Sequence, residues 1–82
     1  MSWLTVIWND EPGGNVEHIA ANGLTTENVD HALSNPVRHT VSRSTGRPAL
    51  YGFTQDGRFI FVAYDEIDED TIEPITAYEV RQ

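Results

Sequence analysis

The sequence predicts an α+β domain in which a curved, mainly antiparallel sheet carries two short helices on one face. Apolar and β-branched segments with a period of two recur along the second half of the chain, as strands do. Two earlier stretches have helical spacing instead. The Asp56-Gly57 pair suits the tight turn of a hairpin between two of the strands. With 82 residues, the chain is expected to form a single domain, 1–82.

The N-terminal quarter is expected to hold a strand, a loop and a short helix. Side chains alternate over residues 3–8, where one side carries Leu4, Val6 and Trp8 and the other carries Trp3, Thr5 and Ile7. Residues 9–14 are rich in Asn, Asp, Pro and Gly, which favour a loop. Val16 and Ile19 have helical spacing, and Gly23 suits a C-terminal cap.

A second helix follows directly. Thr25 or Thr26 can cap it through a hydroxyl group, and the Asn35-Pro36 pair is expected to end it. Its apolar face would carry Val29, Ala32 and Leu33.

The remaining strands are expected over residues 37–42, 49–54, 58–64 and 71–80. Turns are predicted at 44–46 and 55–57, and an acidic connection at 65–70. Pro74 is expected at a sheet edge or a bulge because it cannot donate a backbone hydrogen bond.

The segment from Phe59 to Tyr64 is apolar on both of its faces, which predicts a central strand. Two short helices can cover only one face. The other would need the N-terminal segment with Trp3 and Trp8, a second copy of the chain, or a partner. The alternative is that long side chains and loops suffice.

Charge and composition limit the classes of function. The net charge is −8, with five Arg and no Lys, which lowers the expectation of nucleic-acid binding and favours a basic protein partner. There is no Cys, no signal-peptide pattern and no apolar run approaching the ~20 residues of a membrane span. A cytoplasmic protein without a membrane partner is the simplest expectation.

Several short patterns occur together between Trp8 and Val80. The helical segment from His18 to Val29 is similar to Lys-His-Gly-Val-Ser-Phe-Glu-Glu-Ala, and Asn35-Pro36 occupies the place of an Asp-Pro pair. Five spaced positions complete the pattern: Arg47, Gly52, Thr54, Gly57 and Arg58. In this order they resemble the BrnT-like toxins, a branch of the RelE fold found in toxin–antitoxin systems.

That resemblance implies a ribonuclease that needs no metal, in which the ribose 2′-hydroxyl attacks the adjacent phosphate. Such a reaction requires a base, an acid and cations for the phosphorane charge. The last strand of the family is similar to Arg-Ile-Ile-Ser-Ala-Arg, whereas this chain has Glu-Pro-Ile-Thr-Ala-Tyr from Glu73 to Tyr78. Both arginines are absent, and a carboxylate in place of one would repel phosphate.

Seven residues are candidates for an RNA site. The candidate catalytic residues are Arg47, Arg58, His39 and Tyr78. The candidate substrate-binding residues, cations for phosphate and a ring for a base, are Arg38, Arg43 and Tyr64. The alternative is structural: arginines that balance nearby acids, a solvated strand histidine, and tyrosines that pack half-buried.

The acidic connection is a candidate docking site for a basic partner, through Asp68, Glu69 and Asp70. The alternative is a solvated turn. The segment lacks the ligand spacing of a calcium loop, and the three His show no zinc spacing, so neither a metal nor a cofactor is expected.

Three functions remain open from the sequence. The first is a diverged BrnT-like protein of a toxin–antitoxin pair that acts mainly by binding a cognate antitoxin or another basic protein, and that can form a homodimer. The second is a metal-independent endoribonuclease that inhibits translation. The third is a small acidic interaction module that shares only the fold of the toxins.

Overall fold

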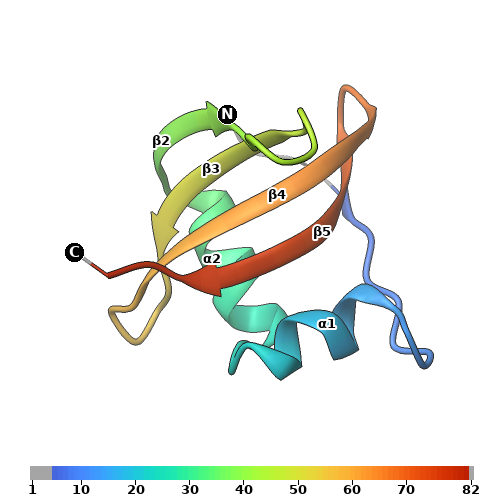
Figure 1. Cartoon of the computed structure of the whole chain (residues 1–82), viewed down its shortest axis with the longest axis horizontal. Helices are drawn as coiled ribbons and strands as arrows, with labels where there is room; N and C mark the ends of the chain where they lie inside the picture. The colour runs from blue at the N-terminus through green and yellow to red at the C-terminus, as the bar shows by residue number, and fades with distance from the viewer. Residues whose placement is uncertain (1–4, 82) are drawn as a thin grey trace.

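The computed structural model describes residues 5–81, which form one five-stranded sheet and two helices (Figure 1). The strands are β1 (Thr5–Val6), β2 (Pro36–Val41), β3 (Pro48–Phe53), β4 (Phe59–Asp68) and β5 (Thr71–Glu79), and the helices are α1 (Asn15–Ala21) and α2 (Thr26–Ser34). The strand order is β1-β5-β4-β3-β2, and only the β1–β5 pair is parallel. The predicted α+β class is therefore confirmed. Neither helix is long and apolar enough to cross a membrane.

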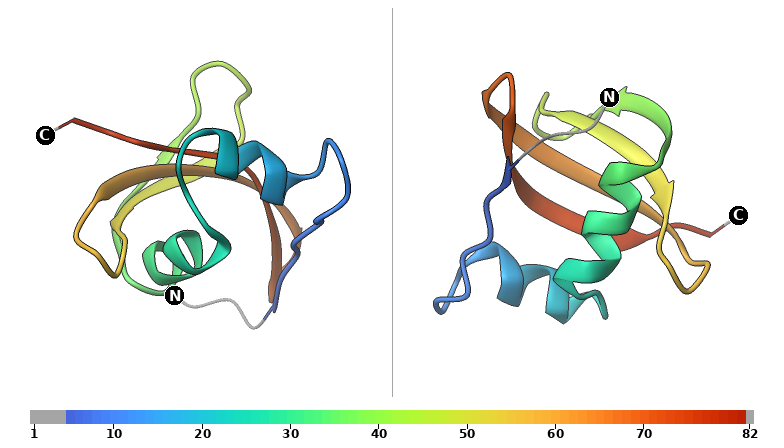
Figure 2. Two further views of the ribbon diagram at one scale, coloured as in Figure 1. Left: turned by 90° about the horizontal axis from the view of Figure 1, so that it is seen from below. Right: turned by 180° about the vertical axis from the view of Figure 1, so that it is seen from behind.

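Helix α2 lies against the concave face of the curved sheet (Figure 2). Thr25 is the cap: its hydroxyl accepts from the Asn28 N–H, and the Asn28 side chain accepts from the Thr25 N–H. The predicted apolar face of α2 is fully buried in the main core. The local capping rules were sufficient to place this helix.

Helix α1 lies along β5 (Figure 1), the strand that also pairs with β1. Two side-chain amides bond to β5: Asn15 Nδ2 donates to the Pro74 carbonyl at 2.8 Å, and Asn22 Nδ2 donates to the Ala77 carbonyl at 2.9 Å. Ile19 anchors the helix in the core with 0% exposure. The helix therefore occupies the place where a further strand would pair.

Strand β4 is central, as predicted, with β3 on one side and β5 on the other. Pro74 lies at an irregularity in the β4–β5 pairing, next to Tyr64, which confirms the predicted bulge. The predicted connection over 65–70 was wrong. Strand β4 continues to Asp68, which pairs with Thr71, because pairing with β5 resumes beyond the bulge.

The first strand is also shorter than predicted. Within the described residues β1 covers only Thr5–Val6, because β5 offers parallel partners only at Thr71 and Ile72. Beyond it, the Asn15 side chain binds the Ile7 carbonyl. Trp3 lies outside the described residues.

The two faces of the sheet are covered in different ways. The main core contains Ile60, Val62 and Tyr64 from β4, packed under the helices. Trp8 packs against this same core and donates to Asp30, so the alternative in which it covers the second face was wrong. On the other face, Phe61 and Ala63 are only 7% and 2% exposed because neighbouring side chains of the sheet cover them. No second chain is required to bury these two residues.

Candidate functional site

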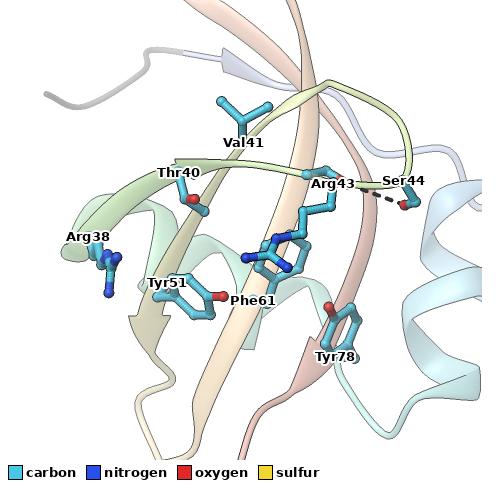
Figure 3. Close-up of a pocket in the computed structure, with 9 residues that line it drawn as sticks. Arg38, Thr40, Val41, Arg43, Ser44, Tyr51, Phe61 and Tyr78 are labelled. Carbon is cyan, nitrogen blue, oxygen red and sulfur yellow. Dashed lines mark hydrogen bonds between the residues drawn. The ribbon is translucent and has the colours of Figure 1, made fainter.

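A hollow of about 370 Å³ lies on the helix-free face of the sheet, below the turn that joins β2 to β3 (Figure 3). It is lined by side chains from four strands and that turn, including two arginines and three aromatic rings: Arg38, Arg43, Tyr51, Phe61 and Tyr78. We call it the outer hollow. Three of the residues predicted from the sequence, one candidate catalytic and two candidate substrate-binding, meet here.

Strand register creates a row of side chains across the outer hollow. Arg38 pairs with Tyr51, Tyr51 with Phe61, and Phe61 with Tyr78, so four neighbouring strands each contribute one residue. The ring of Phe61 lies 5.3 Å from Tyr51 in an edge arrangement and 5.1 Å from Tyr78 in a stacked one, measured between centroids. Because Phe61 is buried and Tyr78 is 44% exposed, the tyrosines present the accessible aromatic surface.

Arg38 and Arg43 are the cations of this site. Within residues 5–81 their guanidinium groups form no hydrogen bond or ion pair. Figure 3 shows the Arg43 side chain extending from the turn toward the rings. The whole stretch from His31 to Gln55 contains no Asp or Glu, although the chain has 13 acidic residues. The outer hollow is therefore a local basic site on an acidic protein.

Arg47 is engaged elsewhere. Its Nε donates to Asp65 Oδ1 at 2.7 Å, and the two side chains are 36% and 40% exposed. Its positive charge is balanced by that carboxylate. The structure places Arg47 outside the lining of the outer hollow.

Arg58 lies on the helix side of the sheet, where intramolecular contacts hold its side chain. Its guanidinium donates to the Gly23 carbonyl and to Asn28 Oδ1, each at 3.0 Å, and pairs with Asp56 at 3.2 Å. The hydrogen bond from the Thr54 hydroxyl, followed by that from Arg58, holds the pKa of Asp56 below its usual value. These contacts tie the β3–β4 hairpin to the start of α2.

The other two candidates are separated from the outer hollow. His39 pairs with Leu50, a residue of the helix-side core, so its side chain leaves β2 on the opposite face from Arg38. Tyr64 is 4% exposed in the same core, where a base cannot stack on it. Burial, followed by the charge of Glu66, raises the pKa of Tyr64 above 10.0. The four candidate catalytic residues are therefore not brought together.

The acidic residues Asp68, Glu69 and Asp70 lie at the exposed tip of the β4–β5 hairpin. Ile67 precedes them and is 54% exposed. Within residues 5–81 no ion pair involves this tip, and no group of three acidic or His side chains could hold a metal ion.

Sequence reasoning missed Tyr51 and Phe61. Their signal was the alternation along each strand, which places Tyr51 on the face of Ala49 and Phe61 on the face of Phe59. Which rings are neighbours depends on register between strands, and that could not be derived from one strand alone.

Comparison of the chain with protein-family models, with curated proteins and with solved structures found no match.

Proposed function

We propose that this protein is a diverged relative of the BrnT-like toxins that acts by binding, and that its ligand is a short segment of single-stranded RNA held in the outer hollow. The observation that carries the proposal is the row of Arg38, Tyr51, Phe61 and Tyr78 with Arg43 beside it. Guanidinium groups bind phosphate, and exposed tyrosine rings stack on bases of any sequence.

Charge makes this binding weak and dependent on salt. The net charge of −8 opposes the approach of RNA, while Arg38 and Arg43, in a segment without Asp or Glu, favour it locally. Two phosphate contacts to a single strand predict a slope of about −1.4 for log K against log salt concentration. Loss of one arginine contact should reduce that slope by about 0.7.

Binding without efficient cleavage follows from the distribution of the polar groups. The described lining of the outer hollow contains no His, Asp or Glu that could serve as a general base. Arg47 and Arg58, the cations that the resemblance assigns, are occupied by intramolecular contacts. Tyr78 lies in the hollow at the position where the family has its last arginine.

The test is the fluorescence anisotropy of a labelled single-stranded RNA titrated with the protein at several salt concentrations. Arg43→Gln should weaken binding and reduce the slope, whereas Arg81→Gln, an exposed control with the same charge change, should not. Tyr78→Ala should weaken binding by about 1–3 kcal/mol. Ile67→Ala removes an exposed apolar side chain elsewhere and should have no effect.

Cleavage is tested with long RNA and with translating ribosomes in EDTA. We expect little or none. Robust cleavage that Arg43→Gln abolishes would replace this proposal with the endoribonuclease, and equal binding by the Arg43→Gln and Arg81→Gln variants would remove RNA from the outer hollow altogether.

A second candidate function is the docking of a basic protein at the β4–β5 tip. The specific observation is the exposed Ile67 beside Asp68, Glu69 and Asp70, three carboxylates that form no ion pair within residues 5–81. The partner to test is the product of an adjacent gene, with a small DNA-binding antitoxin as the expected type. Replacing the three acids by Asn, Gln and Asn should slow association at low salt and leave the fold intact. Association unchanged by both salt and substitution would exclude this surface.

A further inference from the structure

Strand β2 ends the sheet on one side, and its hydrogen-bond pattern shows which groups face outward. The Ser42 N–H donates to the Arg47 carbonyl at 2.8 Å, so Ser42 belongs to a hydrogen-bonded pair with β3. Hydrogen-bonded and non-hydrogen-bonded pairs alternate along an antiparallel ladder. The backbone N–H and C=O groups of Thr40 therefore also point toward β3, whereas those of His39 and Val41 point away from the sheet. Hydrogen-bond partners for these backbone groups must therefore be water or groups outside residues 5–81.

The side chains of this border favour contact with another chain. Val37 and Val41 are each 59% exposed, although edge strands are commonly protected by charges. Pro36 and the bulge at Val37 disrupt the beginning of the strand, so regular pairing is available only from about Arg38 onward. No carboxylate lies on this border, whereas most of the −8 charge lies elsewhere.

We propose that a second copy of this chain pairs with β2 in the antiparallel direction, with Thr40 on the two-fold axis. In that register His39 lies opposite Val41 of the second copy, twice, and every outward-facing backbone group of these residues finds a partner. Thr40 faces Thr40 of the second copy, a favourable cross-strand pair. The two sheets join into one.

Other registers pair fewer of the outward-facing residues of β2 with regular strand partners. Placing His39 opposite His39 of the second copy brings Val41 against the bulged residue Val37. Placing Val41 opposite Val41 of the second copy leaves His39 facing Arg43, which lies beyond the strand. The Thr40-centred register is the one that engages both open residues of each copy.

Charge gives the association an unusual salt dependence. Two chains of charge −8 repel each other, and Arg38 of one copy approaches Arg43 of the other. Salt screens both repulsions, so the dimer should tighten as salt rises, which is opposite to the behaviour expected of RNA binding. The association requires no ligand, but it uses Thr40 and Val41, which also line the outer hollow. The opposite salt dependence distinguishes it from RNA binding.

Single cysteines test the register directly, because the chain has no Cys of its own. Across a non-hydrogen-bonded antiparallel pair the Cα atoms are about 4.5 Å apart, which lies within the range of a disulfide. Under oxidised glutathione, Thr40→Cys should convert to a disulfide dimer. Thr45→Cys, an exposed thiol in the turn, should remain mostly monomeric.

Sedimentation equilibrium in low and high salt measures the unmodified chain. We expect twice the mass of 9.2 kDa at high salt, and return to the single mass for Val41→Lys, which blocks the border without burying a charge in the monomer. A monomer at all salt concentrations, or cross-linking of Thr40→Cys no faster than of Thr45→Cys, would overturn the proposal. Faster cross-linking of His39→Cys or Val41→Cys would overturn the register.

Discussion

Arg47 and Asp65 form a side-chain ion pair of 2.7 Å that connects the end of the β2–β3 turn to the central strand. The pair engages Arg47, which the resemblance to the toxins would make an RNA contact. Because both side chains are more than a third exposed, the pair is expected to stabilise the fold only slightly.

Arg47→Gln should therefore lower the free energy of unfolding by less than about 1 kcal/mol, measured by urea denaturation. RNA binding should be nearly unchanged, because the outer hollow does not include Arg47. A loss of binding as large as that of Arg43→Gln would return Arg47 to the substrate contacts.

Arg58→Ala should be clearly destabilising, by about 1–3 kcal/mol, because it removes charged hydrogen bonds to Gly23 and Asn28. Asn28 is 4% exposed and would lose one of its partners. Arg58→Lys keeps the positive charge but loses the several N–H donors of the planar guanidinium group, and should recover only part of the stability. Full stability of Arg58→Ala with loss of RNA binding would contradict the structural role.

Gly52 is required by the close approach of β3 to α2. A Cβ atom at this position would lie 2.8 Å from the Ala32 carbonyl oxygen, a backbone atom that cannot move alone. Gly52→Ala should lower the free energy of unfolding by about 2–3 kcal/mol, measured by denaturation. Gly46→Ala has open space but a φ of +74°, and should cost only about 1 kcal/mol. The reverse order would show that α2 can shift.

The elements that the sequence predicted well depend on neighbouring residues. Thr25 caps α2 through a residue three positions away, and the Asp56-Gly57 turn sets the β3–β4 hairpin. Gly57 has the positive φ, +89°, that this turn requires. Such short-range rules can be applied without knowing the rest of the fold.

The features that were missed depend on contacts between distant segments. Arg47 and Arg58 looked available because their partners lie 18 and up to 35 residues away in the sequence. The length of β1 was set by the few parallel partners that β5 provides. Arg38, Arg43 and Tyr78 were identified as candidates from the sequence. That they lie next to Tyr51 and Phe61 follows from the register between strands, which the sequence does not reveal.

The raised pKa of the Tyr64 phenol is expected to make the fold less stable in alkali. Its pKa in the folded protein is raised above 10.0, mainly by burial, so the unfolded chain loses the phenolic proton first. The stabilising contribution is fully present below pH 10 and falls as the pH rises through 10 toward the folded pKa. Denaturation midpoints measured from pH 8 upward should fall more steeply for the parent than for Tyr64→Phe. Parallel curves would mean that the phenol is not the responsible group.

The amides of Asn15 and Asn22 have a consequence for the size of any assembly. They occupy carbonyl groups along the β5 border, and β1 occupies others, so that side of the sheet is already taken. A chain with two adhesive borders could add neighbours indefinitely and form fibrils. A chain with one such border stops growing as soon as that border is used, and α1 thereby sets an upper limit of two on sheet-to-sheet addition.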